Sequence, residues 1–255
     1  MLTSGSLNVV AGVRHAFFSR RGGISESVFT SLNCGFGSGD DPDNVAANRA
    51  RAMERLELDP QDLLTVYQTH SPDVVEVDAP WRHEAAPRAD AMVTTRPGLA
   101  LGILSADCAP VLLADGEARV IGAAHAGWRG ALAGVIEATV GAMVRLGARP
   151  ERLVGAIGPC IALRSYEVGP EFPAPFLAAD PGNRIFFAPG QSEEKMLFDL
   201  RGYVTRRLES CGVARVTALP HDTLREERFF SYRRACLAGE RDYGRGLSAI
   251  ALVRL

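Results

Sequence analysis

The segment from Ser105 to Gly130 constrains this chain more than any other part of the sequence. It reads S-A-D-C-A-P-V-L-L-A-D-G-E-A-R-V-I-G-A-A-H-A-G-W-R-G, with two apolar runs on either side of the polar turn at 115–118. Apolar runs of this length around an Asp-Gly turn are typical of a β-hairpin. A turn centred between Gly116 and Glu117 predicts that Cys108 and His125 lie opposite each other, with Cβ atoms roughly 4.5–5.5 Å apart. A thiolate and an imidazole at that separation can share a metal ion or form a nucleophile–base pair.

Length and composition are those of a globular protein. The chain has 255 residues, of which 47% are hydrophobic and 23% charged, with a formal net charge of −2. This charge gives no electrostatic footprint for nucleic acid or an anionic membrane. The apolar runs, such as 99–104 and 109–114, are too short to span a bilayer, and no signal peptide is expected at the N-terminus. We therefore expect a cytoplasmic protein with no nucleic-acid, membrane or obligate protein partner.

Cysteine and lysine usage exclude several kinds of site. The five cysteines are odd in number and form no C-x-x-C pair, which favours a reducing compartment over a disulfide framework. Lys195 is the only lysine and has no G-K-[ST] sequence around it, so a Walker phosphate loop is excluded. We expect the other four cysteines to be packing residues: Cys34, Cys160, Cys211 and Cys236.

Hydrophobic periodicity predicts three helices and many short strands. The helices cover Asp41 to about Leu58, Arg129 to Leu146, and Glu193 to Ser210. The expected strands are Leu63–Gln68, Val74–Val77, Ala91–Thr95, Leu99–Leu104, Val111–Ala114, Val120–Ala124, Leu153–Ile157, Ile185–Phe187, Val213–Ala218 and Ser248–Val253. Several strands are apolar on both faces, as in sheets buried between other layers. Strands outnumber helices without regular alternation, so we predict one α+β domain over residues 1–255 rather than a Rossmann or barrel fold.

His70 is the one other histidine that we expect to join Cys108 and His125 in a catalytic site. It follows the predicted strand Leu63–Gln68, at a place where a side chain can project into a cleft. Two histidines and one cysteine leave a fourth position open, as in catalytic zinc sites. Without the metal, the same residues form a cysteine nucleophile with a histidine base. We expect the remaining histidines to be structural or exposed: His15, His83 and His221.

Several metal and hydrolase motifs are missing from the sequence. Five histidines and no H-x-H pair cannot supply the ligands of a multicopper oxidase. The H-x-E and P-C-x-x-C motifs of cytidine deaminases do not occur, nor do H-E-x-x-H and G-x-S-x-G.

Nine segments in order along the chain resemble those of one known family. They are Ser19-Arg20-Arg21-Gly22-Gly23-Ile24-Ser25, Ser31-Leu32-Asn33-Cys34-Gly35, Gln68-Thr69-His70, Arg88-Ala89-Asp90-Ala91, Ala106-Asp107-Cys108-Ala109-Pro110-Val111, Ala124-His125-Ala126-Gly127-Trp128-Arg129-Gly130, Ile157-Gly158-Pro159-Cys160-Ile161, Tyr166-Glu167-Val168-Gly169 and Phe230-Ser231-Tyr232-Arg233-Arg234. The chain resembles the YfiH family, also called the laccase-domain or multicopper polyphenol oxidase family, and peptidoglycan editing factor in bacteria.

The resemblance implies a fold, a metal and an activity. The fold is a layered α/β/β/α arrangement with mixed buried sheets, similar to the cysteine-hydrolase-like domain of a bacterial deamidating toxin. The ligands of one zinc ion, and the catalytic residues, would be His70, Cys108 and His125. The activity would be phosphorolysis of purine nucleosides (adenosine, inosine and methylthioadenosine) with adenosine deamination, and bacterial members are linked to peptidoglycan precursor editing.

Substrate contacts are expected from three polar residues in the matching segments. Arg20 and Arg129 have planar donors that suit phosphate or ribose, and Asn33 can hydrogen-bond a base or ribose. The segment 235–243 is longer than usual for the family, and 224–228 is unusually charged, so we expect these two segments to reshape the wall of the substrate pocket.

Three other functions stay open. The first is a metal-free cysteine hydrolase or amidase, with Cys108 as nucleophile and His125 as base. The second is a metal-stabilised binding protein for a cell-wall precursor enzyme, in which Cys108 and His125 have no catalytic role. Copper can bind two imidazoles and a thiolate, so slow polyphenol oxidation is a third alternative, as a side activity.

Overall fold

Two β-sheets packed face to face form the centre of the molecule. The structure is a computed structural model that describes residues 1–192 and 194–253. The larger sheet has six strands in the order β12-β8-β6-β7-β4-β3, and the smaller has four in the order β1-β13-β5-β2. The strands of the larger sheet are β3 (Val74–Glu76), β4 (Ala91–Thr94), β6 (Ala109–Asp115), β7 (Val120–Ala126), β8 (Val154–Ile157) and β12 (Arg215–Ala218). Those of the smaller sheet are β1 (Val13–Phe17), β2 (Leu63–Leu64), β5 (Ala100–Ser105) and β13 (Gly246–Leu252).

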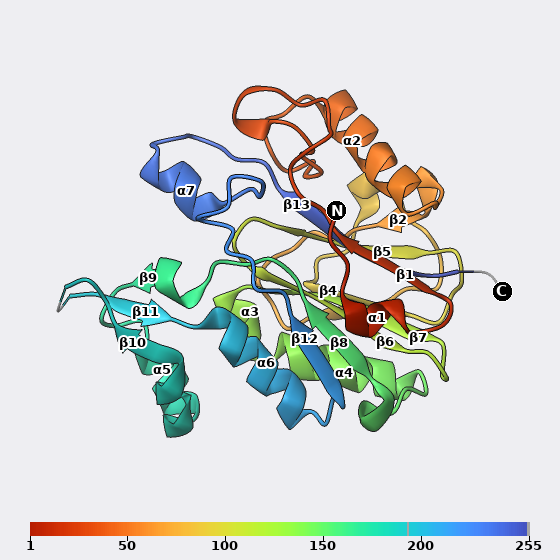
Figure 1. The fold of residues 1–255 in the computed structure, drawn as a ribbon. Coiled ribbons are helices and arrows are strands. Elements are labelled where there is room, and N and C mark those ends of the chain that lie inside the picture. The colour runs from red at the N-terminus through yellow and green to blue at the C-terminus, as the bar shows by residue number, and fades with distance from the viewer. Residues whose placement is uncertain (193, 254–255) are drawn as a thin grey trace.

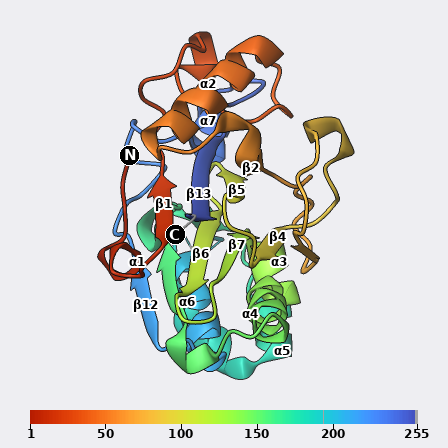
Figure 2. The same cartoon turned by 90° about the vertical axis from the view of Figure 1, so that its right-hand side faces the viewer.

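Helices cover the outer faces of both sheets, which gives four layers (Figures 1 and 2). Helix α2 (Pro42–Arg55) packs on the four-stranded sheet, while α4 (Val135–Arg145) and α6 (Leu200–Ser210) pack on the six-stranded sheet. The remaining helices are α1 (Gly5–Asn8), α3 (Trp128–Ala133), α5 (Ala174–Ala179) and α7 (Tyr232–Leu237). The predicted α+β class and α/β/β/α layering are therefore confirmed. That residues 1–255 form one domain stays a prediction.

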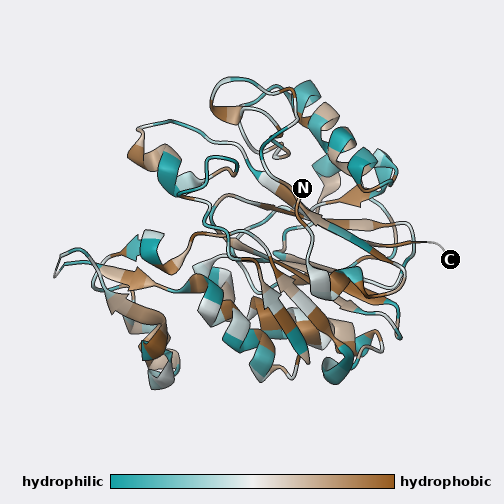
Figure 3. Ribbon diagram, viewed as in Figure 1, coloured by the Kyte–Doolittle hydropathy of each residue, from teal (hydrophilic) through white to brown (hydrophobic). Residues whose placement is uncertain are grey.

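The side chains of the central strands point alternately to two apolar layers, which explains why these strands are continuous apolar runs. In β6, Val111 and Leu113 face α4 and α6, whereas Leu112 and Ala114 face the four-stranded sheet. Successive side chains of a strand point to opposite faces, so a strand between two apolar layers needs apolar residues at every position. Brown, hydrophobic residues accordingly fill the inner strands in Figure 3, and teal ones line the outer sides of the helices.

A small third sheet projects from one end of the molecule (Figure 1). It consists of β9 (Glu167–Val168), β10 (Phe187–Pro189) and β11 (Met196–Phe198), in the order β10-β11-β9. An aromatic cluster joins it to α5 and α6, with ring centroids 4.9 Å apart for Phe176 and Phe198 and 5.2 Å apart for Phe176 and Tyr203. Aromatic pairs at such spacings stabilise a core beyond the area that they bury.

Two predicted helices have different limits in the structure. The helix predicted at Arg129–Leu146 is divided into α3 and α4 by Gly134, whose φ of 98° is left-handed and ends the first helix. The helix predicted from Glu193 begins at Leu200, because Asp199 caps it by accepting the N–H of Gly202 and the preceding residues form β11. Glu193 itself lies outside the described residues.

Two predicted strands also differ. Leu63–Gln68 is a strand only at Leu63–Leu64, and Ile185–Phe187 is divided between a 3₁₀ helix at Pro181–Phe186 and the start of β10. In the second case Asp180 accepts the N–H of Gly182 and starts the 3₁₀ turn. Within the described residues, no helix is both long enough and apolar enough to cross a membrane.

Candidate metal centre

Cys108 and His125 come from neighbouring strands, but not in the predicted register. His125 lies in β7 and pairs with Pro110 of β6, so Cys108 is shifted by two residues and just precedes the strand. The turn is centred between Glu117 and Ala118, one residue later than predicted, which shifts the pairing by two. The Asp115 carboxylate stabilises this turn by accepting the N–H groups of both Glu117 and Ala118. The predicted direct opposition of Cys108 and His125 is therefore wrong.

The structure nevertheless brings the three predicted residues together. One ligand atom from each of His70, Cys108 and His125 lies within 4.8 Å of the others. The Cys108 Sγ is 3.8 Å from Nε2 of His70, and the two imidazole rings have centroids 4.9 Å apart. His125 is buried, Cys108 half-buried and His70 exposed, so the cluster opens to solvent on the His70 side.

A buried carboxylate, Asp90, holds His70 in place. His70 has a left-handed backbone with a φ of 60°, which is uncommon for a residue other than glycine. The Oδ2 atom of Asp90 accepts the N–H of Thr69 at 2.9 Å and that of Ser71 at 2.7 Å. These two bonds flank His70 and fix the loop that carries it.

The same carboxylate orients His125. The Oδ1 atom of Asp90 lies 2.8 Å from Nδ1 of His125, and Asp90 is fully buried. With Nδ1–H donated to Asp90, Nε2 is the atom left to bind a metal or a proton, as in carboxylate–histidine–metal arrangements. Sequence reasoning missed Asp90 as a functional residue. Its only signal was its place in the matching segment 88–91.

Electrostatics favour an ionised Asp90 and a charged His125. Burial raises the pKa of Asp90, but the hydrogen bonds from His125 and from the Ser71 N–H outweigh it and lower the pKa to about 2. Burial lowers the pKa of His125, but the nearby Cys108 and Asp90 outweigh that effect and raise it to about 9. An imidazolium between two anionic groups is the expected state when no metal is bound.

The Cys108 thiol is activated by its neighbours. Burial raises its pKa, but the charge and hydrogen bond of His125, together with those of His70, lower it to about 6. The thiolate is the form that attacks electrophiles and binds metals. Burial instead raises the pKa of Cys34 to about 12 and that of Cys160 to about 11, which marks them as inert thiols.

Gly127 makes room for the cluster. A Cβ atom at this position would lie 2.6 Å from Cδ2 of His70 and 2.9 Å from the Cys108 Sγ. Zinc and copper both bind two imidazoles and one thiolate, and the hydrogen bond from Nδ1 orients one of these imidazoles. Three protein ligands would leave one coordination position for another molecule. The residues present therefore fit a metal ion.

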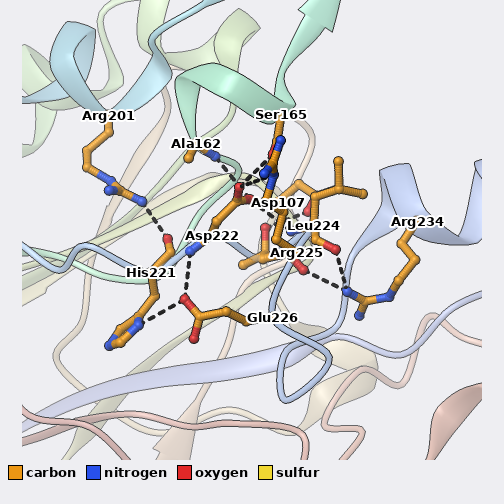
Figure 4. A network of polar contacts seen from close by, with 11 residues as sticks. Asp107, Ala162, Ser165, Arg201, His221, Asp222, Leu224, Arg225, Glu226 and Arg234 are labelled. Atoms are coloured by element: carbon orange, nitrogen blue, oxygen red, sulfur yellow. Dashed lines mark hydrogen bonds and ion pairs between the residues drawn. The ribbon is translucent and has the colours of Figure 1, made fainter.

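Asp107 ties Cys108 to the C-terminal part of the chain. Its backbone has a φ of 87°, and its buried carboxylate accepts hydrogen bonds from Thr223 Oγ1 at 2.6 Å, from Ser231 Oγ at 3.0 Å and from the Arg233 N–H at 2.7 Å. Figure 4 shows the neighbouring network, in which Asp222 accepts from Ser165 and Glu226 contacts His221. Cys108 is thus held from both the 222–226 segment and α7.

The sequence and fold match known proteins over almost the whole chain. A family model described as multi-copper polyphenol oxidoreductase laccase matches residues 14–253. The YfiH protein of Bacillus licheniformis has the same fold, with a TM-score of 0.86 and 29% identity over 94% of this chain and 92% of that one. The chain belongs to the YfiH family.

Relatives in the YfiH family carry an enzymatic name. The chain is 46% identical to a purine nucleoside phosphorylase of Streptomyces griseus over 88% of this chain and 91% of the relative. It is 42% identical to a purine nucleoside phosphorylase of Streptomyces coelicolor over 90% of this chain and 93% of that relative. A Neisseria meningitidis structure assigned to family model DUF152 has a TM-score of 0.84 and 32% identity, covering 96% of each chain.

Arg129 is the predicted substrate contact that adjoins the centre of this YfiH-family chain. It is exposed on α3, two residues after Gly127, with its guanidinium 4.8 Å from the Trp128 ring centroid. Arg233 lies over the Tyr166 ring at 5.6 Å, and its backbone N–H binds Asp107 beside Cys108. Burial raises the pKa of Tyr166 and the nearby Cys108 adds to this, so the phenol stays protonated.

Arg20 and Asn33 lie elsewhere. The Arg20 guanidinium donates to the carbonyls of Thr30 and Val28 and stacks 4.5 Å from the Phe230 ring centroid. It lines a second cavity, of about 370 Å³, together with Arg234.

Asn33 is buried and uses all of its amide atoms inside the protein. Its Nδ2 donates to Ser38 and Asp40, and its Oδ1 accepts from Gly35 and Arg245. With no group left for a substrate, Asn33 organises the loop around it, and the predicted contact to base or ribose is not supported.

Proposed function

We propose that this protein is a purine nucleoside phosphorylase acting on adenosine, inosine and methylthioadenosine. The observation that supports this most is the convergence of His70, Cys108 and His125 within 4.8 Å around an oriented imidazole. Relatives of 36–46% identity over most of the chain are named purine nucleoside phosphorylase. An enzyme needs such a set of activated groups, whereas a binding protein does not.

The proposed cofactor is a zinc ion held by His70, Cys108 and His125. When bound, the metal would supply Lewis-acid chemistry and lower the pKa of a coordinated water to roughly 7. Asp90 would keep Nδ1 of His125 protonated and Nε2 directed to the metal. Asp107 would hold the Cys108 backbone, and Gly127 would leave the space that the ligands need.

In phosphorolysis, a phosphate oxygen bonds to C1′ of the nucleoside as the bond from C1′ to the base nitrogen breaks. The base leaves with the bonding electron pair and takes up a proton, and the products are ribose 1-phosphate and the free purine. Arg129 and Arg233 beside the cluster are the proposed phosphate contacts, since guanidinium groups pair with oxyanions in a fixed geometry. Trp128 and Tyr166 offer ring faces for the purine.

Two further activities belong to this proposal. Adenosine deamination would replace the 6-amino group by an oxygen atom from water and release ammonia. A link to peptidoglycan precursor editing rests on the family resemblance. The five cysteines are free thiols, as a reducing compartment favours, so we propose a cytoplasmic location and small-molecule partners.

A second candidate is a metal-free cysteine hydrolase or amidase acting on a cell-wall precursor. The lowered pKa of the Cys108 thiol, beside a His125 oriented by Asp90, is the observation that favours it. Such an enzyme would be fully active without metal and inactivated by iodoacetamide.

Copper in the same site would support at most slow polyphenol oxidation. Reduction of dioxygen to water takes four electrons, and a single group of potential metal ligands is found among residues 1–192 and 194–253.

The test is product analysis with inosine and phosphate. The zinc-loaded enzyme should release hypoxanthine and ribose 1-phosphate in equal amounts. Cys108→Ala should lower the rate at least 100-fold, while Cys236→Ala, which alters an exposed cysteine, should leave it unchanged. No product from the zinc-loaded wild type, or full activity of Cys108→Ala, would contradict the proposal.

A further inference from the structure

A cavity in the described residues lies away from the metal centre. It has a volume of about 630 Å³, within the range of small-molecule sites. Its walls come from the 162–164 segment, from Ile185 and Phe186, from Asp199 and one face of α6 up to Glu209, and from Ala218, Asp222 and Arg225. None of the three residues of the metal centre lines it.

Four arginines surround this cavity: Arg164, Arg201, Arg206 and Arg225. Within the described part of the chain, the exposed side chains of Arg164 and Arg206 have no hydrogen-bond or ion-pair partner. Arg201 donates through Nη2 to the carbonyl of His221 (Figure 4), and its side chain also interacts with the thiol of Cys160. Among the described residues, Arg164 and Arg206 therefore supply the guanidinium donors of this cavity that have no partner in the protein.

Carboxylates on the cavity wall do not cancel these charges fully. Asp199 accepts the N–H of Gly202, and Asp222 accepts from Ser165, Ala162 and Leu224. Arg225 is 3.9 Å from Asp222 and also donates to Ser165. The third acid of the wall, Glu209, is exposed on α6. Four guanidinium groups against three carboxylates leave the lining of the cavity with one net positive charge.

Part of the cavity wall is apolar. Leu163, Phe186 and Ala218 line it, and Ile185 is 77% exposed at its edge. The cavity therefore offers both guanidinium donors and apolar side chains.

We propose that this cavity binds a small organic phosphate, with the phosphate at Arg164, Arg201 and Arg206 and a ring-sized apolar group against Ile185 and Leu163. A phosphate dianion has three free oxygens and pairs with several guanidinium groups at once, which matches the number of donors here. The site is independent of the proposed phosphorolysis, because it shares no residue with the metal centre.

Isothermal titration calorimetry with 1-naphthyl phosphate tests this, with 1-naphthol as the uncharged control. The wild type should bind the phosphate at least tenfold more tightly than the alcohol. Arg164→Ala/Arg206→Ala should weaken binding of 1-naphthyl phosphate at least tenfold. The matched control is Arg51→Ala/Arg145→Ala, which removes the same charge from two exposed helical arginines elsewhere and should bind like the wild type.

A Cys108→Ala variant separates this cavity from the metal centre, and it should bind 1-naphthyl phosphate as the wild type does. Binding that is lost in Cys108→Ala but kept in Arg164→Ala/Arg206→Ala would place the anion at the metal centre and overturn the proposal. Equal weakening in both double variants, or no binding of 1-naphthyl phosphate to the wild type at millimolar concentration, would also overturn it.

Discussion

The carboxylate of Asp90 lies 2.8 Å from Nδ1 of His125, and its other oxygen binds the backbone N–H groups on both sides of His70. One buried side chain thus positions two of the three residues in the candidate metal centre. Groups that orient metal-binding histidines typically change metal affinity 10–100-fold when they are removed.

Asp90→Asn should therefore weaken zinc binding by about 10–100-fold. An asparagine can keep one bond to the backbone, but it cannot accept from both Nδ1–H and the loop as an ionised carboxylate does. Competition with a chromophoric chelator measures the affinity. Asp73→Asn, an exposed aspartate in the same region, is the matched control and should bind zinc normally. Equal affinity of Asp90→Asn and wild type would show that Asp90 does not position the ligands.

Gly127→Ala should disturb the metal centre with little loss of stability. The backbone of Gly127 has a φ of −72°, which alanine adopts freely, but its Cβ would lie 2.6 Å from His70 and 2.9 Å from Cys108. We expect zinc affinity to fall at least tenfold, with a change in unfolding free energy of about 1 kcal/mol or less. Gly37→Ala is the control, because no atom lies within 4 Å of the added Cβ. Unchanged zinc binding in Gly127→Ala would contradict the geometry of the cluster.

Asp107→Ala should lower stability by about 2–4 kcal/mol. It leaves the hydroxyls of Thr223 and Ser231 and the N–H of Arg233 without their buried acceptor, and it puts alanine at a φ of 87°. Asparagine tolerates that backbone conformation and keeps one acceptor oxygen, so Asp107→Asn should lose less stability than Asp107→Ala. Urea unfolding of the three proteins measures the difference. A larger loss for the asparagine variant would refute the role given to the carboxylate.

His15 makes stability depend on pH. Burial lowers its pKa to about 4, and its Nε2 accepts the N–H of Ser4 at 2.8 Å, so the folded protein holds the neutral ring. The unfolded chain binds a proton below about pH 6.5, which the folded chain does not until about pH 4. Stability is therefore retained above pH 6.5 and lost as the pH falls toward 4.

Between pH 7.5 and 5 this histidine should cost about 2 kcal/mol of unfolding free energy. The glutamine of His15→Gln cannot titrate and keeps an acceptor for the Ser4 N–H. The unfolding free energy of this variant should therefore fall by about 2 kcal/mol less than that of the wild type over the same pH range. Urea unfolding at the two pH values measures both proteins. Equal losses in wild type and His15→Gln would show that His15 is not held neutral.

The layered fold and the three residues of the cluster were predictable from sequence. Apolar runs identified most central strands, although the hairpin register was wrong by two residues. A shift of two keeps each side chain on its face of the sheet, because the side-chain period is also two. Cys108 and His125 therefore still converge.

Other features depend on contacts that no local pattern reveals. Asp90 lies 35 positions from His125 in the sequence, and nothing in the segment 88–91 indicates that its carboxylate is buried. The break at Gly134 was hidden by apolar residues that continue through it, and Asn33 is polar yet buried among loop residues. In each case tertiary packing decides the role of the residue.

The rate of phosphate-dependent hypoxanthine release from inosine, measured against zinc bound per chain, tests the central claim most directly. Metal-free protein titrated with zinc should gain activity in proportion to bound metal and reach its maximum at one zinc per chain. Omitting phosphate should abolish the release. Full activity at zero bound zinc, release without phosphate, or no release at one zinc per chain would contradict the account.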